Sequence, residues 1–271
     1  YHNITGSTTA VIINLEGNNL SGPLPNSIGL LGSNIIQLQL GNNRITKIPN
    51  TIFNLTALES LVLYNNQLTS FPDDKSDCSA TAAMSHTVKI NIQSNPFTQK
   101  AIPATIWLCF PLLQQLTMGN LNLEQISNPP VRMKHLFLLM LVYNSITSIP
   151  SDFFAQFPAL INVDISNNIL RSLHLTIPKS NKIESITLNT NKIASISDSF
   201  FKNLSKLIKL NLVDNLLSAI PESIQFLSGI IFLHLDQNFI TSLPDAIGDL
   251  DSLQILSVSN NRLEKLPDSI C

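Results

Sequence analysis

The stretch Leu38-Gln-Leu40-Gly-Asn-Asn43-Arg-Ile45 decides the fold, because close copies of it return along the chain. One copy runs from Leu61 to Leu68 as LVLYNNQL, and another runs from Leu256 to Leu263 as LSVSNNRL. Successive copies begin 23 to 29 residues apart, which is the spacing of a stacked repeat array. An asparagine marks the same position in nearly every copy: Asn18, Asn43, Asn66, Asn95, Asn144, Asn168, Asn191, Asn215, Asn238 and Asn261.

Each repeat has the residues for one short strand and one turn. The alternation of Leu61 and Leu63 predicts a strand whose apolar side chains point inward. The asparagine that follows is predicted to be buried, so it must satisfy its amide on the backbone of its own turn and of the neighbouring turn. In most repeats an apolar residue and a proline follow, as in Ile48-Pro49 and Leu243-Pro244, and the proline stops the strand from continuing. The asparagines are therefore predicted to form a ladder along a solenoid.

This pattern resembles the leucine-rich repeat superfamily, whose core motif is L-x-x-L-x-L-x-x-N-x-L. The match covers residues 1–271 as a single domain of about eleven repeats. The resemblance implies an α/β repeat solenoid, a curved horseshoe with a parallel β-sheet on its concave face and mostly 3-10 or short helices and irregular segments on its convex face. The first repeat, Asn18–Pro25, resembles the plant-type extracellular repeat. Most later repeats resemble the class shared by animal cell-surface receptors and cytosolic scaffolds.

Three departures from the period are informative. The segment Asp73–His86 lengthens one repeat, and insertions in a solenoid form loops, so an insertion loop is expected at 73–86. In one repeat Leu121 takes the place of the asparagine, and Ile126–Pro130 takes the place of the helical segment expected after it. An irregular turn is therefore expected there. The last repeat stops midway at Cys271, which favours a chain cut from a longer protein.

The three cysteines leave two interpretations open. Cys109 occupies a position of its repeat that is predicted to face the core, and Cys78 lies in the insertion loop one turn of the solenoid away. Either all three thiols are free, or Cys78 and Cys109 form a disulfide that pins the loop and indicates an oxidising compartment.

Four N-x-[ST] sequons occur, at Asn3, Asn19, Asn54 and Asn203. Chance alone predicts about as many in a chain so rich in Asn, Ser and Thr. Asn54 and Asn203 occupy the same position of their repeats on the convex side, where a glycan would not cover the concave face.

Composition excludes several classes of function. Only 13% of residues are charged, and the formal net charge is -2, which does not fit a nucleic-acid-binding protein. No uninterrupted apolar stretch is long enough to span a membrane. No catalytic motif occurs, and the cluster of Asp73, Asp74, Asp77, Cys78 and His86 fits no metal-site spacing. We therefore expect no enzyme activity, no cofactor and no metal.

The concave face is the remaining candidate for function. Its outward positions are mostly uncharged amides and hydroxyls, with apolar islands. Exposed apolar patches often mark contact sites, so the first candidate for partner binding is the island of Leu138, Met140, Val142 and Tyr143. Alternatively, this island packs under a neighbouring loop or meets a second copy of the chain. Further candidates on this face are Val62, Tyr64, Phe232, His234 and Asp236.

The sequence and the resemblance favour a non-enzymatic recognition domain of an extracellular or cell-surface receptor-like protein that binds a protein or peptide on its concave face. An intracellular scaffold or regulatory subunit is the alternative, and binding of glycans or adhesion is a third hypothesis. Fold alone does not decide among them.

Overall fold

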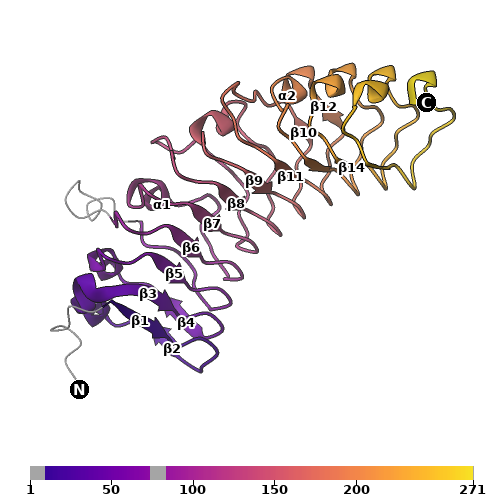
Figure 1. Ribbon diagram of the computed structural model, residues 1–271. Coiled ribbons are helices and arrows are strands. Elements are labelled where there is room, and N and C mark those ends of the chain that lie inside the picture. Colours follow the sequence, from indigo (N-terminus) through magenta and orange to yellow (C-terminus); the bar gives the residue numbers. More distant parts are fainter. Residues whose placement is uncertain (1–9, 74–83, 271) are drawn as a thin grey trace. The chain divides into compact units, whose positions relative to one another are not determined.

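A computed structural model of the chain describes residues 10–73 and 84–270 (Figure 1). The chain divides into two compact units. Unit 1 comprises Tyr1–Leu123 and Pro129–Leu136, and unit 2 comprises Glu124–Asn128 and Phe137–Cys271. Each unit is a stack of repeats and is described separately below. The sequence-based prediction of a single domain over residues 1–271 stays a prediction.

Within each unit, every repeat contributes one strand to a parallel sheet. In unit 1 the order is β1 (Val11–Asn14), β3 (Ile35–Gln39), β5 (Ser60–Val62), β6 (Lys89–Asn91) and β7 (Gln115–Thr117). In unit 2 it is β8 (Leu138–Met140), β9 (Asn162–Asp164), β11 (Ser185–Thr187), β13 (Lys209–Asn211), β14 (Phe232–His234) and β15 (Ile255–Ser257). The register keeps equivalent positions opposite each other: Ile186 pairs with Val163 and with Leu210. Equivalent side chains therefore form columns across the sheet.

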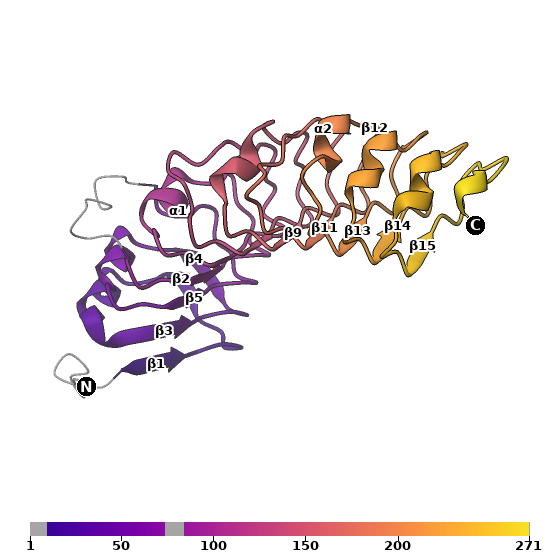
Figure 2. The same ribbon diagram turned by 45° about the horizontal axis from the view of Figure 1, so that its top comes forward.

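Short helices cover the side of each unit opposite the strands (Figure 2). A proline directly precedes six of them, as Pro49 precedes η3 (Asn50–Asn54). The fixed φ of proline suits the first position of a helix and ends the preceding strand. This confirms the predicted 3-10 and short helical segments, which are η2 (Asn26–Asn34), η3 (Asn50–Asn54), α1 (Ala104–Leu108), η5 (Phe153–Gln156), α2 (Asp198–Phe201), η6 (Glu222–Phe226), η7 (Asp245–Asp249) and η8 (Asp268–Ile270).

The core of each unit lies between the strands and the helices. Strand leucines such as Leu61 and Leu63 are fully buried, as the alternation predicts. On the helix side of unit 1, Phe53, Phe71 and Phe110 contact one another, with ring centroids 6.2 to 6.4 Å apart. Burial of one such ring stabilises the fold by about 1.5–3 kcal/mol. Aromatic residues thus fill the wider, helical side of the stack.

The asparagine ladder is confirmed, and Asn215 shows its geometry. The Asn215 side-chain amide donates to the carbonyl of Leu212 in its own turn at 3.0 Å and to that of Leu188 in the preceding repeat at 3.1 Å. Its Oδ1 accepts from the backbone N–H of Ile193 at 3.0 Å. Asn215 is only 3% exposed, so these bonds satisfy an amide that water does not reach. The ladder joins each repeat to the one before it.

The ladder is weaker at three of the predicted positions. Asn18 is exposed and donates only within its own turn, to Leu15 and Glu16, since no earlier described repeat covers it. Asn144 and Asn261 are half-buried instead of buried. Asn261 still bridges to the preceding repeat, because its Oδ1 accepts from Ile240 at 3.0 Å.

Leu121 interrupts the ladder within the irregular turn that the sequence predicts. Leu121 is fully buried, but a leucine side chain has no atom that can accept a hydrogen bond. The backbone N–H of Phe97, at the position that donates to a ladder asparagine in other repeats, therefore donates to the Asn95 carbonyl at 2.9 Å. Two left-handed residues flank Leu121, Asn120 with φ 54° and Asn122 with φ 58°. The described residues 121–135 contain no helix.

Two features of the side walls were not predicted from the sequence. Short parallel pairs join neighbouring repeats, β2 (Ser21–Pro23) with β4 (Arg44–Lys47) and β10 (Ser172–Leu173) with β12 (Ser195–Ile196). A row of hydroxyls on the helix side also bridges repeats through donation to backbone carbonyls. Its members are Thr51 to Asn26, Thr105 to Pro72, Ser199 to Leu175 and Ser269 to Asp245, at 2.6 to 3.1 Å.

Ser223 lies at the same phase of its repeat as these hydroxyls, yet its Oγ has no hydrogen-bond partner among the described residues. The side chain is 6% exposed, and the next repeat has Ala246 at this phase. A buried hydroxyl without a partner destabilises a fold. We therefore expect Ser223→Ala to leave the free energy of unfolding unchanged or to raise it by about 1 kcal/mol, measured by urea denaturation. The matched variant Ser199→Ala removes a formed bond and should lower it. Equal losses in the two variants would contradict this interpretation.

Two further predictions touch the residues that are not described. Most of the insertion loop 73–86 lies in residues 74–83 and therefore outside the described part of the chain. Cys109 is 1% exposed, as its core phase predicts, and it is disulfide-bonded. The other two cysteines, Cys78 and Cys271, lie outside the described residues, so the pairing of Cys109 with Cys78 stays a prediction.

Candidate recognition surface

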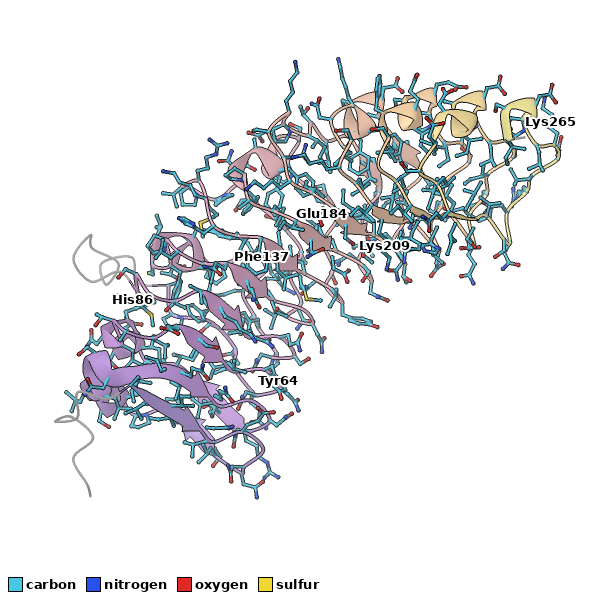
Figure 3. All side chains as sticks on the ribbon, in the orientation of Figure 1. Tyr64, His86, Phe137, Glu184, Lys209 and Lys265 are labelled. Atoms are coloured by element: carbon cyan, nitrogen blue, oxygen red, sulfur yellow. The ribbon has the colours of Figure 1, made fainter. Side chains whose placement is uncertain are left out.

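The strand face, meaning the outward side of the sheet in each unit, carries all the candidate binding residues predicted from the sequence. Figure 3 shows the described side chains, with Tyr64 labelled in unit 1 and Phe137 and Lys209 in unit 2. Outward and inward positions alternate along each strand, so the columns predicted from the sequence lie side by side on this face.

The first candidate patch lies on β8 of unit 2 and in the turn after it. Leu138, Met140 and Val142 are half-buried, whereas Leu139 and Leu141 between them are fully buried. The strand and the turn after it therefore present three apolar side chains outward in a row. We call Leu138, Met140, Val142 and Tyr143 the β8 patch.

Tyr143 is the most exposed part of the β8 patch, with 62% of its surface accessible, and its backbone is left-handed with φ 55°. Every repeat places a left-handed residue just before the ladder position. Elsewhere in the described chain this position holds glycine or a smaller polar residue: Gly17, Asn42, Asn65, Ser94, Asn120, Asn167, Thr190, Asp214, Gln237 and Asn260. A bulky aromatic residue in this conformation is an outlier and costs about 1–2 kcal/mol. Packing does not explain the tyrosine, because most of its ring is in solvent.

We expect Tyr143→Asn to raise the free energy of unfolding by about 1 kcal/mol, because asparagine tolerates the left-handed conformation better. Thermal or urea denaturation measures this gain. Val142→Asn is the matched control, since Val142 lies in the same turn but has no positive φ, and it should bring no gain. A loss of stability in Tyr143→Asn would show that the ring stabilises the fold.

The second candidate patch lies on β14, β15 and the turn after β14 in unit 2. Phe232 and His234 are half-buried, while Phe239 is 38% and Ile255 45% exposed. Arg262 covers one face of the Phe239 ring, with its guanidinium carbon 4.5 Å from the ring centroid. Such a contact leaves the aromatic edge available while adding a cation to an apolar surface.

Asp236 is held by the neighbouring repeat. One of its carboxylate oxygens accepts from the Oγ atoms of Ser257 and Ser259, both at 2.6 Å, and from the Ser259 N–H at 2.8 Å. Partial burial acts to raise the pKa of Asp236, but these hydrogen bonds outweigh it and hold the pKa below its ordinary value. The bonds therefore stabilise the fold at neutral pH, and their contribution is lost as the pH falls through the lowered pKa. Asp236 orders the turn of its repeat and is already occupied by hydrogen bonds.

In unit 1 the two predicted residues differ in exposure. Val62 is 8% exposed and offers almost no surface to a partner, although it lies at an outward position. Tyr64 is half-buried and lies over Gly41, where any side chain would meet its ring within 2.5 Å. The Tyr64 hydroxyl donates to the Glu16 carboxylate and accepts from Asn42 at 3.0 Å.

The hydrogen bond to Glu16 is the largest cause that raises the pKa of Tyr64 above its ordinary value. Glu16, Asn42 and Tyr64 therefore form a polar cluster across three repeats, and the small Gly41 makes room for it. Glycine at an outward strand position was the sequence signal for this cluster.

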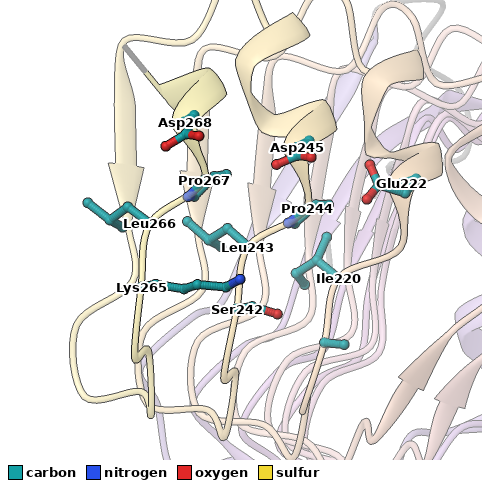
Figure 4. A pocket seen from close by; sticks show the side chains of 11 residues that line it. Ile220, Glu222, Ser242, Leu243, Pro244, Asp245, Lys265, Leu266, Pro267 and Asp268 are labelled. Carbon is teal, nitrogen blue, oxygen red and sulfur yellow. The ribbon is translucent and has the colours of Figure 1, made fainter.

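Residues 10–73 and 84–270 do not provide the arrangement of side chains that a metal ion needs. Within these ranges, no group of three His, Cys, Asp or Glu side chains is placed to hold a metal ion. A pocket of about 490 Å³ lies on the helix side of unit 2, between Leu243, Leu266 and their flanking residues (Figure 4). Its acidic side chains are Glu222, Asp245 and Asp268, and Glu222 accepts from the Ala246 N–H at 3.1 Å. The lining contains neither histidine nor cysteine.

The four sequons are not equivalent in the structure. Asn19 and Asn54 are exposed, Asn203 is half-buried, and Asn3 lies outside the described residues. In the described part of the chain, no helix has the length and apolar character needed to cross a membrane.

Comparison with known proteins agrees with the geometry. Models of the leucine rich repeat match residues 181–240, 33–74, 11–31 and 252–271. The chain belongs to the leucine-rich repeat superfamily, and its architecture is the solenoid of that superfamily. No curated protein sequence matches it.

Solved structures show the same fold. The structure of the Toll–Spatzle complex from Drosophila is similar with a TM-score of 0.80 at 21% identity, over 94% of this chain and 35% of that one. The LRIM1/APL1C complex has a TM-score of 0.80 at 21% identity, over 98% and 47%. The PEPR1-AtPEP1 structure has a TM-score of 0.76 at 26% identity, over 94% and 36%. The chain thus spans less than half the length of each of these three proteins.

Proposed function

We propose that the chain is a non-enzymatic recognition domain of an extracellular or cell-surface protein, and that it binds a protein or peptide through the β8 patch. The observation that carries this proposal is Tyr143, an exposed aromatic residue in a backbone conformation that disfavours it. Strain that packing does not explain is concentrated at functional sites in proteins. Tyrosine beside apolar side chains is also a typical anchor of protein interfaces.

Three observations support the type of partner and its compartment. The strand face around the patch is largely uncharged, which suits a partner held by apolar anchors and hydrogen bonds. The disulfide at Cys109 favours an oxidising compartment. Two of the similar structures are protein complexes, Toll with Spatzle and LRIM1 with APL1C.

The test uses a defined probe. Linear peptides selected from a random display library against the immobilised chain should converge on sequences that bind at the β8 patch. Amide resonances or exchange rates of β8 and its turn should change on binding, and those of β11 should not. Peptides that bind elsewhere and leave β8 unchanged would contradict the proposed site.

A further inference from the structure

We propose that Asn54 is an N-glycosylation site of the folded protein, and that Asn203, at the same phase of another repeat, is not one. Both belong to complete sequons, Asn54-Leu-Thr56 and Asn203-Leu-Ser205. In both, the leucine of the sequon is fully buried, so the two sequons have the same position relative to the core of their repeats. The sequences therefore predict equal behaviour, and the structure separates the two sites.

Asn54 presents its amide to solvent. It is the last residue of η3 and is exposed, and its side chain makes no hydrogen bond to any described residue. Its Nδ2 lies beside Gly29, where a Cβ would come within 3.1 Å of it. Because glycine has no Cβ, the preceding repeat leaves room for this amide without a hydrogen bond to it. A sugar on Asn54 would displace no bond of the fold.

Asn203 uses the same amide to join repeats. Its Nδ2 donates to the carbonyl of Ile177 in the preceding repeat at 2.6 Å, and the residue is half-buried. Asn181, which is 5% exposed, donates its own amide to the Asn203 backbone carbonyl at 2.8 Å. A glycan on Asn203 would have to fit on a half-buried Nδ2 that lies 2.6 Å from the Ile177 carbonyl, so the preceding repeat leaves less room for a sugar than at Asn54.

The modification is a group transfer from a lipid-diphosphate-linked oligosaccharide. The Asn54 Nδ2 forms a bond to C1 of the first sugar, the bond from C1 to the diphosphate oxygen breaks, and the amide proton is lost as the lipid diphosphate leaves. Transfer needs only the sequon in an accessible chain. Retention of the glycan in secreted, folded molecules then depends on whether the folded structure has room for it.

This inference rests on the extracellular placement proposed above, so the experiment imposes that placement. The chain is secreted from cultured animal cells behind a heterologous signal sequence. The glycans are then removed enzymatically in ¹⁸O-water, which marks each occupied asparagine by its mass. We expect the secreted, folded protein to be labelled at Asn54 and not at Asn203.

Two variants remove a sequon without a change at the asparagine itself. Thr56→Ala should lower the intact mass by one glycan, whereas Ser205→Ala should leave it unchanged. Asn203→Gln should lower the melting temperature of the secreted protein, while Asn54→Gln should not. Occupancy of Asn203 equal to that of Asn54, or an unmodified Asn54, would overturn the inference. Neither result would bear on the β8 patch, because peptide binding there is measured separately.

Discussion

Peptides selected against the chain are expected to bind the double variant Leu138→Asp/Met140→Asp at least about 100-fold more weakly than the unchanged protein. This loss corresponds to about 2.7 kcal/mol, the scale at which a few buried anchors dominate an interface. The physical reason is that each aspartate replaces an apolar side chain that a partner would bury. A buried carboxylate without a partner charge costs free energy well beyond the lost apolar contact.

The matched control places the same substitutions on β11, as Ser185→Asp/Thr187→Asp. These residues occupy the same two columns of the strand face and are also half-buried. The control adds the same charge to the same sheet, so it should leave peptide affinity within about threefold. Circular dichroism of both variants checks that the fold persists. If both variants bind equally well, or lose affinity equally, the β8 patch is not the recognition site.

The second large effect is expected in the ladder. Asn215→Ala should lower the free energy of unfolding by about 2–5 kcal/mol. The substitution leaves the Ile193 N–H without its acceptor in a site that is 3% exposed. It also removes one of the two donors to the Leu188 carbonyl, which still accepts from Asn191. Urea denaturation measures the loss. Hydrogen exchange gives a local measurement, because the Ile193 amide should lose most of its protection.

Asn189→Ala is the control for the ladder, since Asn189 lies in unit 2 but faces outward. Its amide donates only to the Thr190 hydroxyl, at 3.3 Å. A surface change of this kind should alter stability by no more than about 0.5 kcal/mol. The ladder interpretation fails if Asn215→Ala and Asn189→Ala have the same effect, or if Ile193 keeps its protection in Asn215→Ala.

Periodicity was sufficient to predict the architecture. One strand per repeat, an inward leucine pair, a buried asparagine and a short helix after a proline all follow from the phase of the sequence. These features recur at the same position of every repeat and involve only the adjacent repeats, so the period of the sequence is enough to predict them. The irregular turn at Leu121 could be predicted for the same reason, because the residue that should accept a hydrogen bond is missing.

The details that depend on neighbouring repeats could not be predicted. Val62 lies at an outward position, yet its neighbours cover it. Asp236 was predicted as a binding residue, but the serines of the next repeat donate to one of its carboxylate oxygens. Asn54 and Asn203 have equal sequons, and only the surroundings of their amides differ. Exposure and side-chain partners are set by which residues the stacking brings together, and the period of the sequence does not contain that information.

The left-handed position also offers a rule for reading other repeat arrays of this phase. The residue just before the ladder asparagine has a positive φ in every described repeat, so glycine and small polar residues are expected there. A bulky residue there stands out without any structure or alignment. Among the described repeats of this chain, the rule selects Tyr143 as the one aromatic residue, beside the smaller β-branched Thr190. Applied to a sequence alone, the rule would identify the repeats of another solenoid in which a bulky residue occupies the left-handed position at a cost in folding stability. Those repeats would be the first candidates for contact with a partner.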